Sequence, residues 1–334
     1  MRAMLHRGWW LVTSLYLVVE AQLTPLQLVL LGTAQGIAVL LTEVPTGVVA
    51  DRFSRKWSIV ISHVLMGSAM FATSQATAFE AVLLTQVLWG ISWTFSSGAD
   101  VAWVTDEAGD TNNIARYLTI AARCELVGSA IGLAIFGLIA WQLSLALSMA
   151  TAGLLMCLLG AYVAIAFNEN RQRLKASQQL SLTQTLVSGV AVAKSSKTVL
   201  SVLAVTFIVN GADEVFNRLY VRHLTDLGMP SVLDSMLWLT ALGMVTLGVG
   251  AVVLRAVQNN VQGEGPIRRF YVAGCVSGAL GLLLFAQAPG FSVAIAGFVL
   301  VHGVAWHLVR TLGVLLVNRH AQTENRATIQ SFMS

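Results

Sequence analysis

The stretch TEVPTGVVADRFSRKWS, residues 42–58, places Asp51, Arg52, Arg55 and Lys56 between two long apolar segments. Hydrophobic residues make up 56% of the chain and charged residues only 11%, with a mean hydropathy of +0.73. Because a soluble domain carries about 25% charged residues, this chain has too few polar groups to cover a surface that faces water. The composition predicts an all-α, polytopic membrane protein in which the charged stretch forms a loop between two spans.

The apolar segments have the length of membrane-spanning helices. A bilayer core is crossed by about 20 mostly apolar helical residues, and this length predicts about ten spans. Pro25 lies just inside the start of the second span, where its missing N–H costs nothing. The predicted spans cover residues 6–23, 25–50, 57–78, 79–106, 113–141, 143–167, 197–222, 231–256, 268–288 and 290–318.

One long polar stretch divides the chain. The segment NENRQRLKASQQLSLTQTLVSGVAVAKSSK follows the sixth predicted span. We therefore expect an N-terminal six-helix bundle over 1–167, a cytoplasmic linker over 168–196 and a second bundle over 197–334.

The basic residues set the predicted orientation, because Lys and Arg are retained on the cytoplasmic side of a membrane. With the N-terminus inside, the external loops hold only Arg218 and Arg222, while Arg123 and Arg310 lie within helices on the inner side. This distribution predicts a multi-pass protein of the plasma (inner) membrane with a cytoplasmic N-terminus. It also explains the net charge of +4 without a nucleic-acid partner.

Polar residues inside the spans recur every third helix, in the first, fourth, seventh and tenth. Charges in a bilayer are costly, so such residues face a protein interior or a water-filled cavity. Repeats of three helices are typical of secondary transporters. The cavity, substrate or proton candidates are Tyr16, Glu20, Trp93, Asp100, Trp103, Arg123, Asp213, Glu214, Arg218, His302, Trp306 and Arg310.

Two of these groups have alternative interpretations. Asp100 and Arg123 lie at similar predicted depths, which favours a structural ion pair, although a substrate or proton role and a misplaced helix boundary stay open. Asp213 and Glu214 are adjacent carboxyl groups that repel each other when both are ionised, which favours proton binding. Pairing of Glu214 with Arg218 is the alternative.

Other signals indicate packing and not chemistry. The three cysteines lie in apolar runs without metal-like spacing. His302 and His307 do not share a helical face, so no metal site is expected. Gly128 and Gly132 form a GxxxG pattern, which indicates close helix packing. Without Walker A, GxSxG or HExxH motifs, the sequence predicts neither an enzyme nor a cofactor.

The loop sequence GVVADRFSRK and the segment GISWTFSSGADVAWVTDEAG (90–109) resemble the major facilitator superfamily, in particular its bacterial drug-efflux-type members. The family signature in this loop is G-x-x-x-D-R-x-G-R-[RK], and Ser54 replaces its second glycine, which suggests a less tight turn. The resemblance implies two six-helix bundles that expose a central cavity alternately to each side of the membrane.

The resemblance also implies a conformational latch between the bundles. In the family, the aspartate of the loop caps the start of the eleventh helix, where the helix dipole favours an anion. The arginines pair with acids at the end of the fourth helix. A basic loop that only fixes topology is the alternative. The latch residues are Gly47, Asp51, Arg52, Arg55, Lys56, Asp106 and Glu107.

The family has twelve helices, and the sequence RATIQSFMS (326–334) has only the polar beginning of an eleventh. We therefore expect six helices followed by four of an expected six, and a C-terminal bundle that is incomplete.

The expected function is secondary active transport of a small solute, as proton-coupled export of an amphipathic organic molecule, with the lipid bilayer as its surroundings. The alternative is a truncated membrane protein without transport activity, either a decayed gene product or an interaction scaffold. The sequence leaves the oligomeric state open.

Overall fold

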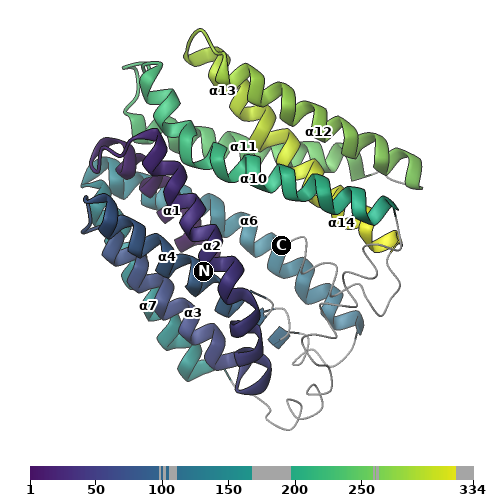
Figure 1. Ribbon diagram of the computed structural model, residues 1–334, viewed down its shortest axis with the longest axis horizontal. Coiled ribbons are helices and arrows are strands. Elements are labelled where there is room, and N and C mark those ends of the chain that lie inside the picture. The colour runs from purple at the N-terminus through teal and green to yellow at the C-terminus, as the bar shows by residue number, and fades with distance from the viewer. Residues whose placement is uncertain are drawn as a thin grey trace. The chain divides into compact units, whose positions relative to one another are not determined.

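The protein is described from a computed structural model that covers residues 1–97, 99–100, 103–104, 111–167, 197–258, 260 and 263–320. Helices and the turns that join them make up this described part, which contains no β-strand (Figure 1). The predicted all-α class is confirmed. The predicted linker, Asp106, Glu107 and the segment 326–334 lie outside the described residues.

The chain forms two compact units. The first comprises Met1–Leu180 together with Asn217–Arg222, and the second comprises Ser181–Phe216 and His223–Ser334. This division does not test the predicted boundaries at residues 167 and 197, because the segment between them is outside the described part.

Six helices and one segment of a seventh build the first unit. Thr24 begins the second helix with a capping box: its side chain accepts a hydrogen bond from the backbone N–H of Gln27, and the Gln27 side chain accepts one from the backbone N–H of Thr24. Pro25 is the first helical residue, as predicted. The helices are α1 (Arg2–Val19), α2 (Pro25–Arg52), α3 (Arg55–Thr73), α4 (Phe79–Ser96), α6 (Thr111–Gln142) and α7 (Leu145–Ala166), and the segment belongs to α10 (Lys197–Asp226).

Glycines allow the helices of the first unit to pack at backbone distance. A Cβ atom on Gly132 of α6 would overlap the carbonyl oxygen of Met4 in α1, and one on Gly67 of α3 would lie 2.6 Å from the carbonyl oxygen of Gly153 in α7. At Gly128, by contrast, the nearest atom is the Met4 nitrogen at 3.6 Å, an ordinary contact. The close packing predicted from the GxxxG pattern is therefore confirmed, and Gly132 is the position that requires it.

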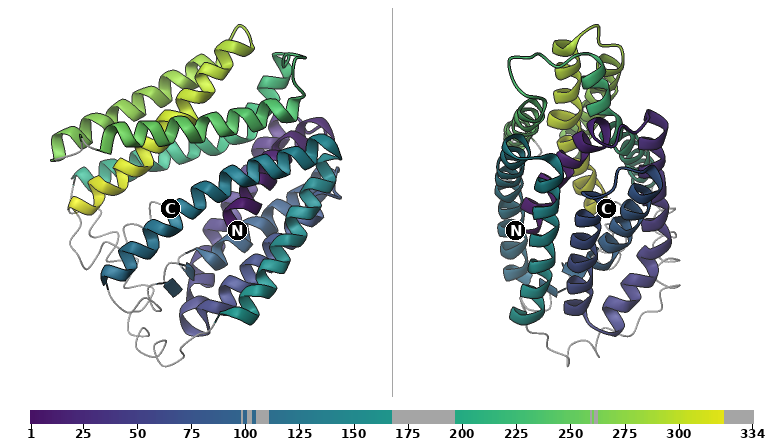
Figure 2. Two further views of the ribbon diagram at one scale, coloured as in Figure 1. Left: turned by 180° about the vertical axis from the view of Figure 1, so that it is seen from behind. Right: turned by 90° about the vertical axis from the view of Figure 1, so that its left-hand side faces the viewer.

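The second unit is built around α12. It contains the rest of α10, α11 (Ser235–Gln258), α12 (Glu264–Ala286), α13 (Phe291–Phe298), the π-helix η1 (Val299–Ala305) and α14 (Trp306–His320). Figures 1 and 2 show α12 beside the continuous run of α13, η1 and α14, against which it packs. Tyr271 of α12 and Leu312 of α14 belong to the buried core of this unit.

The predicted count of about ten helices is not confirmed. The described part contains eleven α-helices and one π-helix, and seven of its helical segments are long and apolar enough to cross a membrane. One reason for the difference is that the predicted span 290–318 consists of three successive elements, since the π turn interrupts the α-helical hydrogen bonding.

We expect Gly132→Ala to destabilise the protein by about 1–3 kcal/mol, because the added methyl group would overlap a backbone atom that cannot move alone. The melting temperature of the purified protein in detergent measures the effect. Gly128→Ala is the matched control: its methyl group meets no overlap and alanine favours a helix, so the melting temperature should stay constant or rise. Equal melting temperatures of the two variants would contradict the close contact at Gly132.

Candidate functional site

The candidate site lies in the first unit and is centred on Arg218, which is 7% exposed. Its Nη2 donates a hydrogen bond to Oε1 of Gln35 in α2 at 2.6 Å, and its Nη1 donates to Oε1 of Gln86 in α4 at 3.3 Å. Its guanidinium carbon lies 4.7 Å from the ring centroid of Trp10 in α1, a cation–π distance. Three helices thus hold one buried cation. Arg218 lies inside α10, as the predicted span 197–222 implies, although the charge count assigned it to the external side.

Aromatic rings from α1 and α4 continue the site beyond Trp10. The Trp89 ring lies 5.7 Å from Trp10, 6.3 Å from Trp9 and 5.8 Å from Trp93, measured between centroids. His6 stacks on Trp89 at 5.2 Å. The spacing of these residues along each helix, three or four positions, places their side chains on the facing sides of α1 and α4. The result is a continuous aromatic wall beside a buried guanidinium.

A narrow hollow lies next to Arg218. Thr13 and Ser14 of α1 contribute hydroxyl groups, and Ser14 donates to the carbonyl oxygen of Trp10 at 2.8 Å. The hollow is lined by Trp10, Thr13, Ser14, Leu17, Leu28, Asn217 and Arg218. The hollow measures about 10 Å³, which is room for about one water molecule. The first unit therefore gathers a cation, amides, hydroxyls and aromatic faces around a space that would have to widen to bind an organic solute.

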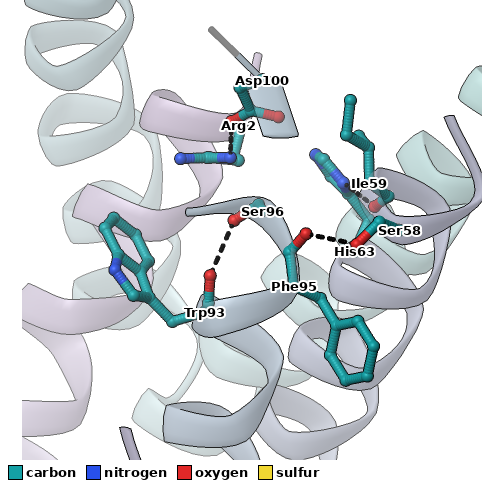
Figure 3. A network of polar contacts seen from close by, with 8 residues as sticks. All are labelled: Arg2, Ser58, Ile59, His63, Trp93, Phe95, Ser96 and Asp100. Atoms are coloured by element: carbon teal, nitrogen blue, oxygen red, sulfur yellow. Dashed lines mark hydrogen bonds and ion pairs between the residues drawn. The ribbon is translucent and has the colours of Figure 1, made fainter. Parts of the chain in front are cut away.

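A second polar contact ties α1 to the chain beyond α4. Arg2 donates a hydrogen bond from Nη1 to Oδ2 of Asp100, and its guanidinium carbon lies 5.3 Å from the Trp93 ring (Figure 3). Both side chains are partly exposed, at 29% and 38%. The predicted pairing of Asp100 with Arg123 is therefore wrong. Arg123 is exposed on α6, and Arg2 was not among the candidate residues.

Hydrogen bonds to the backbone support this region from α3 and α4. Figure 3 shows the Ser58 hydroxyl donating to the carbonyl oxygen of Phe95 at 2.7 Å, and the Ser96 hydroxyl donating to that of Trp93 at 3.0 Å. His63, which is buried, has Nδ1 at 2.7 Å from the carbonyl oxygen of Ile59. The Ser58 contact holds the end of α4 against α3, whereas the other two contacts each lie within one helix.

Three other predicted cavity residues of the first unit lie in packing or surface positions. The Tyr16 hydroxyl donates to the carbonyl oxygen of Ala76 at 3.1 Å and the side chain is 2% exposed. Glu20 is exposed directly after α1. Trp103 stacks on Phe167 at 4.4 Å. The structure does not bring these three residues together with Arg218.

In the second unit, Asp213 and Trp306 line one cavity of about 270 Å³ between α10, α12 and the run of η1 and α14. The remaining lining is apolar, from residues such as Val209 and Leu282. His302 packs against Phe216 and Phe298, with ring centroids at 5.1 and 4.8 Å. Glu214 is partly buried on α10. Arg310 is exposed, and its guanidinium carbon lies 5.6 Å from the Trp306 ring.

The predicted latch is only partly described. Asp51 and Arg52 lie in the last turn of α2, with side chains outside the described part. Ser54 accepts a hydrogen bond from the backbone N–H of Trp57 at 3.0 Å and so caps α3. Its φ of −174° is extended backbone, so this position does not require glycine. Serine therefore replaces the glycine of the family pattern as a helix cap.

The other latch positions lie in or next to these helix ends. Arg55, the first residue of α3, is 8% exposed, and the Lys56 ammonium lies 5.9 Å from the Trp57 ring. No atom of the described residues lies within 4 Å of a Cβ placed on Gly47. No neighbouring helix among the described residues therefore approaches closely at Gly47.

Sequence reasoning missed several residues of the site. Gln35 and Gln86 are amides inside apolar runs. This position could have identified them as site residues, because an amide in a bilayer needs a hydrogen-bond partner. Trp9 and Trp10 were not selected, since they lie apart from the polar residues that marked the candidates of the first span.

We expect Asp100→Asn and Arg2→Gln to be non-additive in a double-mutant cycle, with a coupling of about 0.5–1 kcal/mol, because the ion pair is partly exposed to solvent. Thermal unfolding of the wild type, both single variants and the double variant measures the coupling. Asp100→Asn combined with Arg123→Gln is the matched control and should be additive within about 0.5 kcal/mol. Coupling of Asp100 to Arg123 in place of Arg2 would contradict the ion pair between Asp100 and Arg2.

Comparison with known proteins places this geometry in context. Residues 4–334 match the sequence profile described as Major Facilitator Superfamily. A search of curated proteins gave no match.

Solved transporter structures have a similar fold. The structure of the nucleoside transporter NupG is 16% identical with a TM-score of 0.77, covering 99% of this chain and 83% of that chain. A peptide transporter POT in complex with sulfate is 13% identical with a TM-score of 0.70, covering 99% and 83%. A bacterial homologue of the human lysosomal transporter Spinster, inward-facing and unoccupied, is 13% identical with a TM-score of 0.68, covering 99% and 77%. At these identities the likeness concerns the fold alone.

Proposed function

The chain belongs to the major facilitator superfamily, and from this premise we propose that it exports a small amphipathic organic solute in exchange for protons. Membership of this family makes the chain a multi-pass membrane transporter and not an enzyme. The class of solute, the direction of transport and the proton as coupling ion are what we propose beyond membership of the family.

The observation that carries the proposal is the Arg218 site of the first unit. A guanidinium held by two amide oxygens lies on the Trp10 ring, and Trp89, Trp9 and Trp93 continue from Trp10 as a set of ring contacts, so polar and apolar groups lie side by side. An amphipathic solute uses both kinds of contact, since its polar group requires hydrogen bonds and its apolar part favours aromatic faces.

The proposed proton carriers are Asp213 and Glu214 of α10. Asp213 lines an otherwise largely apolar cavity, where an ionised carboxylate is poorly solvated and proton binding relieves the cost. Glu214 follows it directly, so that protonation of one residue removes charge repulsion for the other. Pairing of Glu214 with Arg218 stays the alternative role for that residue.

Orientation and conformational control complete the proposal. We place the N-terminus in the cytoplasm and the protein in the plasma membrane, on the asymmetry of Lys and Arg along the chain. The loop from Asp51 to Lys56 then lies on the cytoplasmic side, and we propose that it acts as the latch of the transport cycle, with Asp106 and Glu107 as partners.

We expect Asp213→Asn or Glu214→Gln to abolish proton-coupled transport, because neither amide can take up and release a proton. The purified protein in vesicles with an imposed pH gradient is tested for proton movement, reported by an internal pH-sensitive dye, on addition of candidate solutes. Glu80→Gln is the matched control, since Glu80 is an exposed acid in the first turn of α4. Unchanged coupling in both test variants would exclude Asp213 and Glu214 as carriers.

A further inference from the structure

Pro45 lies inside α2, near the C-terminal end of the helix. Its ring nitrogen carries no hydrogen, so it cannot donate to the carbonyl oxygen of Leu41 one turn earlier, and the ring crowds that oxygen. A helix bends most easily at such a position. The part of α2 that follows Pro45 ends with Asp51 and Arg52, which belong to the proposed latch.

Side-chain hydrogen bonds hold this weak point of α2 against α4, on which the helix packs. The Ser97 hydroxyl, directly after α4, donates to the Glu43 carboxylate at 2.6 Å. The Thr46 hydroxyl lies 3.1 Å from the carbonyl oxygen of Thr94, and the hydroxyls of Thr42 and Thr94 lie 3.2 Å apart. We call these five residues the clasp. Its three members on α2 come from the turn that contains the proline.

The contact between Ser97 and Glu43 has a hydrogen that no other acceptor shares in the described part of the chain. Each threonine hydroxyl of the clasp carries a single hydrogen and also lies near a carbonyl oxygen of its own helix, at 2.7 Å for Thr42, 2.8 Å for Thr46 and 2.8 Å for Thr94. A length of 2.6 Å is typical of a hydroxyl that donates to a carboxylate, and such bonds are stronger than neutral ones. The bond between Ser97 and Glu43 therefore contributes most to the clasp.

Two buried alanines of α2 lie on opposite sides of the proline. Ala50, which follows Pro45, is 5% exposed and belongs to a buried cluster with residues of α3 such as Ile59. Ala38, which precedes Pro45, is 9% exposed. A movement of the helix end about the proline would take Ala50 out of its cluster and leave Ala38 buried. The two positions therefore distinguish such a movement from a general loosening of the helix.

We propose that Glu43 is a positioning residue of the transport cycle. Through Ser97 it holds the segment of α2 after Pro45, and with it the proposed latch, against α4. Release of this hydrogen bond lets the segment pivot at the proline and moves Asp51 and Arg52 as one unit. This inference rests on the proposed function, since it concerns how the proposed latch is held in place.

The rate of thiol labelling measures the position of the segment. Single cysteines are introduced as Ala50→Cys or Ala38→Cys into the full chain, in which the native cysteines are replaced by alanine. The purified protein in detergent reacts with a water-soluble maleimide, and mass spectrometry follows the reaction. We expect both positions to react slowly, because a buried thiol reacts only after a local opening exposes it.

Variants remove the hydrogen bond from either end. We expect Ser97→Ala and Glu43→Met each to raise the labelling rate of Ala50→Cys about tenfold, since the opening no longer breaks a hydrogen bond to a carboxylate. Glu43→Gln keeps an acceptor oxygen at the same position and should raise the rate less than about threefold. The labelling of Ala38→Cys is the matched control, and its rate should stay constant in all three variants.

Pro45→Ala tests the pivot itself. Alanine supplies the N–H that donates to the carbonyl oxygen of Leu41, so the segment is then held by its own helix. Compared with Pro45→Ala alone, the addition of Glu43→Met should raise the labelling rate of Ala50→Cys less than about threefold.

An unchanged labelling rate of Ala50→Cys in both Ser97→Ala and Glu43→Met would overturn the inference. So would an equal increase at Ala38→Cys, which would show a general loosening of the helix, or a tenfold increase that persists with Pro45→Ala. The measurement uses neither a solute nor a pH gradient. Its failure is therefore distinct from a failure of proton coupling, which would contradict the proposed function instead.

Discussion

A bilayer core offers no water to hydrogen-bond, and this constraint decides where polar side chains of the protein lie. Arg218 illustrates it: the guanidinium is buried and donates to amides of two other helices, Gln35 and Gln86. Apolar side chains occupy the outward positions, such as Leu40 at 76% and Ile165 at 84% exposure. A polar group inside a membrane bundle therefore needs side chains from several helices as hydrogen-bond partners. A solute-binding site has the same requirement, because its groups also come from several helices.

Backbone-distance packing makes that convergence possible in the first unit. Because Gly132 lets α6 contact α1, and Gly67 and Gly153 let α3 contact α7, these helices need no bulky side chains at their crossings. The large rings of α1 and α4 then face each other, with Trp9 and Trp89 in parallel contact. On α1, Gly132 of α6 packs against Met4 on one side, and the tryptophans occupy the other side.

The sequence could predict features that depend on local rules and on composition. Pro25 marked the start of α2, and the GxxxG pattern indicated a close helix crossing, because both effects act within a few residues. Arg218 was selected as a cavity candidate within a predicted span, but its partners Gln35 and Gln86 were not, because they lie far away in the chain. The partner of Asp100 was missed for the same reason, since Arg2 is 98 positions away and nothing local connects them.

The π-helix of the second unit shows why a regular helical period fails at a functional region. His302, Trp306 and Arg310 have the spacing of one α-helical face, yet η1 inserts a wider turn between α13 and α14. His302 packs against Phe216 and Phe298, while Trp306 lines the cavity of Asp213 and Arg310 is exposed. The wider turn changes the direction of the side chains that follow it. Val301, Ala305, Trp306 and Val309 nevertheless line the cavity of Asp213 at the same spacing as Gly274, Gly278, Ala279 and Leu282 of the regular helix α12, so the cavity lining is kept across the π turn.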